Sequence, residues 1–147
     1  MSENPVGLRH ILVADDEPHI GRIIKMKLEN GPFRVTLAYD GQEAVEILER
    51  ESDIDLVLLD LMMPRLSGMD VLERVRQNEK WKDIPCIILT AAGADQHQKD
   101  AMKTGAADFL TKPFSPKKLY ALVAKLTGVA EEDSGDGESG SVNGANG

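Results

Sequence analysis

Residues 55–68 read Asp55-Leu56-Val57-Leu58-Leu59-Asp60-Leu61-Met62-Met63-Pro64-Arg65-Leu66-Ser67-Gly68. The four consecutive aliphatic residues at 56–59 predict a short strand that is covered on both faces, as in the middle of a parallel sheet. The strand ends on the carboxylate Asp60; Pro64 cannot extend it, and Gly68 permits the turn into the next helix. Because open α/β sheets bind their ligands beyond the carboxyl ends of the strands, Asp60 is predicted to face a binding site.

Strand-like and helix-like segments alternate along the rest of the chain. Amphipathic helices follow each strand, with start signals such as Pro18, Asp40, Ser67 and Ser115. Five such units predict an α/β fold, a doubly wound five-stranded parallel sheet with helices on both faces. The four further strands are predicted at residues 10–14, 33–38, 84–89 and 107–111.

Length and composition limit the classes of protein to consider. A chain of 147 residues with 41% hydrophobic residues is long enough for one domain with one core. No apolar run approaches the length of a membrane span, and the polar start has no signal-peptide core, so no membrane insertion is expected. The net charge of −8 argues against direct binding to nucleic acid. The single cysteine, Cys86, lies in an apolar run and cannot form an internal disulfide, which fits a cytoplasmic protein.

The chain divides into three parts. Residues 1–8 are predicted to be an N-terminal extension, 9–128 a folded domain, and 129–147 an acidic tail rich in glycine and serine that we expect to be disordered. Residues 130–147 hold five acidic side chains and no basic one. The rest of the chain has 20 acidic and 17 basic side chains, so the folded part is close to neutral.

Polar side chains follow four of the five predicted strands directly. They are Asp15 and Asp16, Asp60, Thr90, and Lys112. In a doubly wound sheet all four strand ends lie on the same rim, so these side chains should converge. Three carboxylates at close range need positive charge. Lys112 supplies one, and a hard divalent cation that takes oxygen ligands, expected to be Mg²⁺, can supply the rest.

This set of groups is suited to phosphoryl transfer. Asp60 is the candidate nucleophile, which would form an aspartyl phosphate. A metal held by Asp15 and Asp16, together with Lys112, would neutralise charge on the phosphoryl oxygens. Thr90 could then donate a hydrogen bond to one of those oxygens and move with its strand end.

Each residue taken alone has an ordinary interpretation. Asp15 and Asp16 could be acids at a helix N-terminus, Asp60 a helix cap, Thr90 a satisfied hydroxyl and Lys112 a surface charge. Their predicted convergence on one rim favours the functional interpretation. Two features stay ordinary: Trp81 is expected to anchor a loop, and the three histidines share no metal-ligand spacing and are expected at the surface, namely His10, His19 and His97.

The same motifs resemble the receiver domain of bacterial two-component response regulators, over about residues 9–127. They are Asp15-Asp16, Leu59-Asp60-Leu61-Met62-Met63-Pro64 with Gly68, Thr90-Ala91 and Lys112-Pro113-Phe114. Together in this order they are highly specific, although each alone would be weak. The resemblance implies the flavodoxin-like strand order 2-1-3-4-5.

The resemblance also implies a mechanism. A partner histidine kinase or phosphotransfer protein would phosphorylate Asp60, with Mg²⁺ on Asp16, Asp60 and the Met62 carbonyl and with Asp15 bound through water. Thr90 and Phe109 would form the switch, and the Lys112-Pro113 bond would be cis. Family members often have polar residues at the positions of Met62 and Ala92 that orient water, so the phosphorylated state is expected to hydrolyse slowly. The chain would be no enzyme beyond its own phosphorylation and dephosphorylation.

Three functions compete at this point. The first is an interaction module whose face, formed by the fourth helix, fifth strand and fifth helix, changes on phosphorylation and contacts a downstream protein. A phosphatase of the haloacid dehalogenase type would need a second acid where Met62 stands. A flavin or nucleotide binder would need a phosphate-binding loop where this chain has the acidic run Asp15-Asp16-Glu17. The module is favoured, either stand-alone, like the chemotaxis regulators, or as a fragment of a larger regulator whose output domain is missing.

Overall fold

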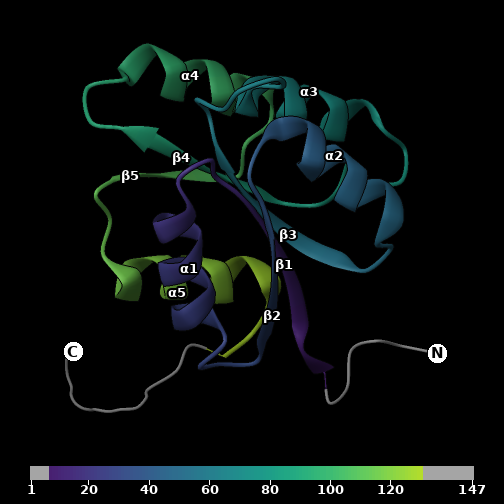
Figure 1. The fold of residues 1–147 in the computed structure, drawn as a ribbon, viewed down its shortest axis with the longest axis vertical. Helices are drawn as coiled ribbons and strands as arrows, with labels where there is room; N and C mark the ends of the chain where they lie inside the picture. Colours follow the sequence, from purple (N-terminus) through teal and green to yellow (C-terminus); the bar gives the residue numbers. More distant parts are fainter. Residues whose placement is uncertain (1–6, 131–147) are drawn as a thin grey trace.

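The computed structural model describes residues 7–130, in which strands and helices alternate throughout (Figure 1). Residues 131–147 of the predicted disordered tail and residues 1–6 of the predicted N-terminal extension lie outside the described residues. No helix within this range is both long and apolar enough to span a membrane. The elements are β1 (Arg9–Ala14), α1 (Pro18–Leu28), β2 (Phe33–Ala38), α2 (Gly41–Arg50), β3 (Ile54–Asp60), α3 (Gly68–Gln77), β4 (Cys86–Ala91), α4 (Asp95–Thr104), β5 (Asp108–Lys112) and α5 (Pro116–Thr127).

The sheet confirms the predicted fold class. All five strands are parallel and pair in the order β2-β1-β3-β4-β5. Helices α1 and α5 cover one face of the sheet, and α2, α3 and α4 cover the other (Figure 1). β3 therefore lies in the middle, with neighbours on both edges and helices on both faces.

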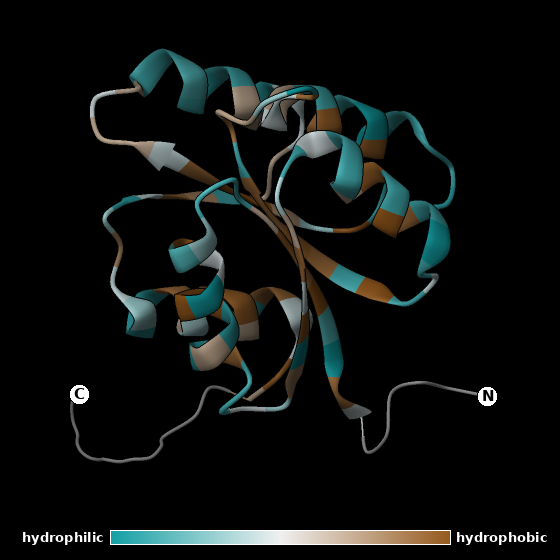
Figure 2. Cartoon of the chain, viewed as in Figure 1, coloured by the Kyte–Doolittle hydropathy of each residue, from teal (hydrophilic) through white to brown (hydrophobic). Residues whose placement is uncertain are grey.

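The aliphatic run of β3 fills two cores at once. Leu56 and Leu58 belong to the core under α1 and α5, whereas Val57 and Leu59 belong to the core under α2, α3 and α4. All four side chains are fully buried, and the centre of the molecule is correspondingly hydrophobic in Figure 2. Each such side chain contributes roughly 1.5–3 kcal/mol of burial free energy, which holds the end of the strand in place.

Side-chain caps set where three helices begin. Asp40 Oδ1 accepts a hydrogen bond from Glu43 N at 2.8 Å at the start of α2. Ser67 and Asp70 form a reciprocal capping box at α3. Ser115 caps α5, with Pro116 in the first turn. Because every helix follows a parallel strand, these starts lie near the carboxyl rim of the sheet.

The structure corrects the expected surface position of His10. Its side chain is fully buried in β1, one strand in from the edge. Nδ1 lies 2.8 Å from Asp53 Oδ1, and Nε2 lies 2.7 Å from Thr36 Oγ1. Burial of a polar ring is tolerated here because both nitrogens have partners. Arg34 completes the group with an ion pair to Asp53 at 2.7 Å.

Candidate functional site

Four strand ends meet at one rim of the sheet. Asp60 is the last residue of β3, and the register places it opposite Leu89 of β4. On the other side of β4, Ala91 is opposite Lys112 of β5. An open pocket of about 490 Å³ lies at this rim. It is lined by Asp16, Glu17, Asp60, Leu61, Met62, Thr90, Ala91, Ala94, His97 and Lys112.

Asp60 is buried and held from two sides. Its residue is 7% exposed. Oδ1 accepts a hydrogen bond from Met62 N at 3.1 Å, and Oδ2 accepts one from Lys112 Nζ at 3.2 Å. The chain returns close by: Gly68 N donates to Leu61 O at 3.0 Å, and a Cβ at Gly68 would collide with the Asp60 carbonyl. The carboxylate is therefore fixed in orientation.

Lys112 bridges the acidic side chains of the rim. Its Nζ lies 2.8 Å from Asp15 Oδ2, 3.1 Å from Glu17 Oε1 and 3.2 Å from Asp60 Oδ2. Burial lowers the pKa of Lys112, but the hydrogen bonds and charges of these carboxylates outweigh it and raise the pKa above its ordinary value. The ammonium thus stays charged in the site.

The carboxylates of Asp15 and Asp60 repel each other even though Lys112 lies between them. Burial raises the pKa of Asp60 to about 6, and the negative charge of Asp15 acts in the same direction. The Met62 amide and Lys112 oppose this shift without cancelling it. The site therefore holds more negative charge than a single ammonium neutralises.

The residues present fit a hard divalent cation. Ligand oxygens of Asp15, Asp16 and Asp60 lie within 4.8 Å of one another. Asp15 and Asp60 are buried and Asp16 is exposed, so the group is open to solvent on one side. Asp15 Oδ1 is oriented by Glu17 N at 2.9 Å. An oxygen-only donor set with excess negative charge is the type of site that binds Mg²⁺ while leaving room for waters or phosphate.

The predicted switch residues occupy different places. Thr90 is 3% exposed, is the next-to-last residue of β4 and lines the pocket together with Asp60. Phe109 is half-buried, lies opposite Ile88 and packs against the core under α2, α3 and α4. Phe109 is absent from the pocket lining, so the structure brings Thr90 but not Phe109 to the site. The Lys112-Pro113 peptide bond is cis, as the resemblance implies.

Two polar residues that line the pocket, Glu17 and His97, were not predicted as site residues from the sequence. Glu17 contacts Lys112, and the acidic run at residues 15–17 did not predict this contact. Its position directly after Asp15-Asp16 was the available signal. His97, on the first turn of α4, lines the pocket, although spacing between histidines carried no hint of this.

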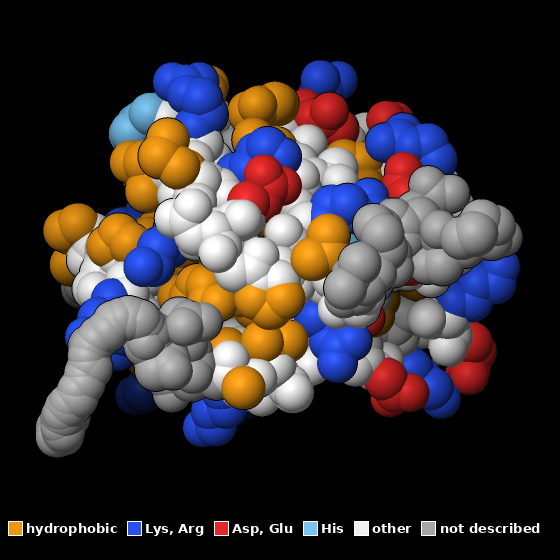
Figure 3. Space-filling view, turned by 90° about the horizontal axis from the view of Figure 1, so that it is seen from below, with side chains coloured by type: hydrophobic (Ala, Val, Ile, Leu, Met, Phe, Trp, Pro, Cys, Tyr) orange, Lys and Arg blue, Asp and Glu red, His pale blue; other side chains and the backbone are white. Residues whose placement is uncertain are grey.

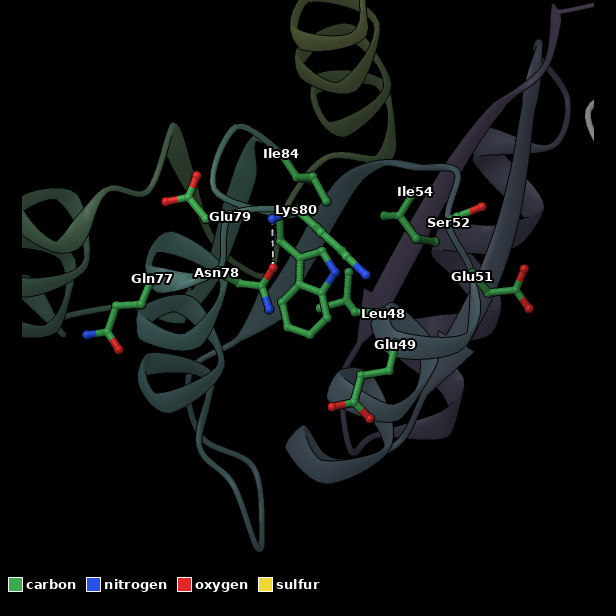
Figure 4. Close-up of a pocket in the computed structure, with 11 residues that line it drawn as sticks. Leu48, Glu49, Glu51, Ser52, Ile54, Gln77, Asn78, Glu79, Lys80 and Ile84 are labelled. Carbon is green, nitrogen blue, oxygen red and sulfur yellow. Dashed lines mark hydrogen bonds between the residues drawn. The ribbon is translucent and has the colours of Figure 1, made fainter.

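A larger hollow of about 950 Å³ lies at the opposite end of the sheet (Figure 4). It is bounded by the ends of α2 and α3 and by the loop before β4, and Trp81 lines it. Lys80 N donates to Asn78 Oδ1 at 2.8 Å beside it. Trp81 also packs against the core, which agrees with its expected role as a loop anchor. Volume alone thus does not identify the site; convergence of charged groups does.

Comparison with known proteins points to one family. The family model described as the response regulator receiver domain matches residues 11–124. The chain is 40% identical over 116 residues to the transcriptional regulatory protein SrrA of Staphylococcus aureus (strain NCTC 8325 / PS 47), covering 79% of this chain and 46% of that protein. It therefore spans about half the length of the curated relatives it matches.

Solved structures of response regulator receiver domains are also similar to this chain. The receiver domain of the Francisella response regulator 1452 is 35% identical with a TM-score of 0.75, covering 82% of this chain and 97% of that chain. A response regulator receiver domain protein from Clostridium thermocellum is 34% identical with a TM-score of 0.76, covering 82% and 95%. The chemotaxis response regulator CheY4 of Vibrio cholerae is 25% identical with a TM-score of 0.76, covering 82% and 99%.

Proposed function

The chain belongs to the response regulator receiver family, and we propose that it accepts a phosphoryl group on Asp60 from a histidine kinase or phosphotransfer protein. One observation carries this proposal. The buried carboxylate of Asp60 lies 3.2 Å from Lys112 Nζ and within the oxygen cluster of Asp15 and Asp16. A nucleophile, a fixed positive charge and a cation site thus meet at one point.

The proposed step follows from these groups. A carboxylate oxygen of Asp60 forms a bond to phosphorus, and the bond between phosphorus and the donor breaks, with its electron pair leaving on the donor. The Lys112 ammonium stabilises negative charge on the phosphoryl oxygens. Asp15, Asp16, Asp60 and the Met62 carbonyl would hold Mg²⁺. When bound, the ion supplies further positive charge for the transferring group.

We propose that the phosphorylated chain acts through protein contacts. Thr90 lies near the end of β4 and lines the same pocket as Asp60, so a hydrogen bond from its hydroxyl to the phosphoryl group would displace the end of β4 and the start of α4. Phe109, half-buried on β5, could change its position in response. The resulting change would reach the face formed by α4, β5 and α5, where a downstream protein would bind. In this proposal the chain acts in the cytoplasm and catalyses only its own phosphorylation and dephosphorylation.

A second arrangement has an observation in its favour. The chain matches 46% of the length of SrrA, a transcriptional regulatory protein. Asp60 phosphorylation could accordingly control a further domain of a longer regulator, in place of separate protein partners. The chemistry at the rim is the same in both arrangements, so the first test addresses that chemistry.

The test is intact-mass spectrometry after incubation with acetyl phosphate and Mg²⁺. We expect one phosphoryl adduct on the wild type, none on Asp60→Asn, and an undiminished adduct on the control Asp83→Asn, which alters an exposed acid outside the site. An adduct that persists in Asp60→Asn would overturn the assignment of the acceptor. Absence of an adduct in the wild type despite bound Mg²⁺ would restrict the proposal to transfer from a protein donor.

A further inference from the structure

The loop between β3 and α3 is attached to the start of α2 by one side chain. Arg65 Nε donates a hydrogen bond to Asp40 Oδ2 at 3.1 Å, and Arg65 Nη2 lies 2.9 Å from the same oxygen. Twenty-five residues separate the two partners in sequence. The contact therefore joins two loops at the rim, one of which contains Met62.

Asp40 is a rigid anchor for this contact. Its side chain is only 11% exposed, and its other oxygen caps α2 through Glu43 N at 2.8 Å. That backbone hydrogen bond, against the effect of burial and with help from the Arg65 charge, lowers the pKa of Asp40 below its ordinary value. The carboxylate is thus ionised and oriented by the helix before Arg65 reaches it.

The backbone of Arg65 is held in an unfavourable conformation. Its φ of 68° lies in the left-handed region that favours glycine, and Arg65 is the one non-glycine residue in residues 7–130 with positive φ. Such a conformation persists only where the surroundings impose it. Here Leu66 N donates to Pro64 O at 2.8 Å on one side, and the guanidinium is tied to Asp40 on the other.

The loop also packs tightly against its neighbours. A Cβ atom at Gly41, the first residue of α2, would collide with the carbonyl of Leu66. A Cβ at Gly68 would collide with the carbonyl of Asp60. The segment from Leu61 to Ser67 therefore has little freedom to shift as long as Arg65 keeps its outer edge against α2.

From these contacts we propose that Arg65 is a positioning residue for the acceptor site, a role that rests on the proposed function. By fixing the loop to Asp40, it keeps the Met62 amide on Asp60 Oδ1 and presents the Met62 carbonyl to a bound cation. The side chain of Arg65 is 70% exposed, and an ion pair that exposed contributes little to stability. Its effect should therefore appear in cation binding and loop motion more than in unfolding.

The test compares Arg65→Gly, which relieves the backbone and removes the guanidinium, with Asp40→Ser, which keeps a capping oxygen but removes the charge. Arg50→Ala is the matched control. The side chain of Arg50 is similarly exposed (64%), and its Nε lies 3.5 Å from Glu51 Oε2 in an ion pair that is remote from the rim. In metal-free protein, amide exchange at Met62 should accelerate about tenfold in both test variants. The Mg²⁺ dissociation constant by calorimetry should rise roughly tenfold.

The proposal makes three predictions for the variants, and two other results would contradict it or the function on which it rests. The proposal predicts that Arg65→Lys recovers part of the Mg²⁺ affinity, that saturating Mg²⁺ restores the phosphorylation rate of Arg65→Gly, and that Arg50→Ala matches the wild type. If the wild type is phosphorylated but amide exchange at Met62 and Mg²⁺ affinity are unchanged in Arg65→Gly and Asp40→Ser, the positioning role of Arg65 is wrong and the proposed function still stands. A wild type that binds Mg²⁺ but is phosphorylated on Asp60 neither by acetyl phosphate nor by a protein donor would instead overturn the proposed function, and the exchange data would still test the loop contact.

Discussion

At the scale of single residues, the site depends on charges that oppose one another. Lys112 contacts three carboxylates, yet burial and Asp15 still raise the pKa of Asp60 to about 6. This excess of negative charge favours the binding of a cation, because a bound cation would relieve repulsion that the fold imposes. Removal of Lys112 would leave that repulsion without its internal counter-charge.

We propose that the side chains of Met62 and Ala92 make the phosphorylated state long-lived. Met62 is 69% exposed at the mouth of the pocket, and Ala92 is also exposed. Neither side chain can hydrogen-bond a water molecule and direct it at phosphorus. Since such positioning contributes to hydrolysis, the double variant Met62→Asn, Ala92→Glu should lose phosphate faster, by about tenfold or more.

The measurement for this prediction is the decay of the phosphoryl adduct followed by intact mass. Met26→Asn is the control, because Met26 is equally exposed (71%) but lies on α1. A double variant that keeps its phosphate as long as the wild type would show that access of water to Asp60 is set elsewhere, for example by His97 on the pocket wall.

At the scale of elements, the site requires β3 and α3 to approach closely. Gly68 begins α3, and its Cα lies against the carbonyl of Asp60 with no room for a side chain. Gly21 in α1 offers a comparison: a Cβ there would meet only Leu37 at 3.4 Å, an ordinary contact. Both glycines are helical and buried, but only one lies at the acceptor strand.

Gly68→Ala should therefore destabilise the fold and weaken phosphorylation together. The added methyl must push α3 away from β3, at a cost of about 1–3 kcal/mol in the free energy of unfolding. Gly21→Ala should be neutral or stabilising by up to about 1 kcal/mol, because alanine loses less entropy than glycine in a helix. Urea unfolding and adduct formation measure both effects; an undisturbed Gly68→Ala would mean that the gap between β3 and α3 is wider than described.

At the scale of the whole molecule, the fold separates a chemical rim from helical faces that could meet partners. The side of the molecule on which α1 and α5 lie has apolar side chains exposed among lysines and arginines (Figure 3). On α1, Ile23 is 45% and Met26 71% exposed. The acidic cluster, by contrast, is confined to the carboxyl ends of the strands.

Because the acidic cluster is assembled only in the folded chain, Mg²⁺ should change the stability of the whole domain. A cation that binds only the folded chain stabilises it, by about 1.4 kcal/mol at ten times the dissociation constant. The unfolding midpoint should rise on addition of Mg²⁺ and fall back with a chelator. Asp16→Asn should abolish most of this response, because Asp16 is the exposed carboxylate of the cluster proposed to hold the cation, whereas Asp83→Asn should leave it intact. An equal response in both variants would place the cation outside the acidic cluster.

The sequence by itself determined the elements and the chemical groups at their ends. The aliphatic run at 56–59, the capping residues Asp40, Ser67 and Ser115, and the polar residues after four strands are local signals, because burial and capping act over a few neighbouring residues. The strand boundaries differ from the prediction by a few residues: β3 begins at Ile54 and includes Asp60, and β4 runs to Ala91. The strand order followed from the family resemblance and not from periodicity.

Tertiary structure alone decided the pairings between distant side chains. The sequence placed Lys112 and Asp60 on one rim, but the direct contact between these side chains, 52 residues apart, is decided by the fold. The burial of His10 depends on Asp53 and Thr36 from other parts of the chain. The contact of Arg65 with Asp40 has no local signature, and the position of Glu17 after Asp15-Asp16 does not specify Lys112 as its partner. The physical reason is that such a contact forms only when strand register, helix packing and the side-chain rotamer together place two atoms at hydrogen-bond distance. A local pattern in the sequence specifies none of these three.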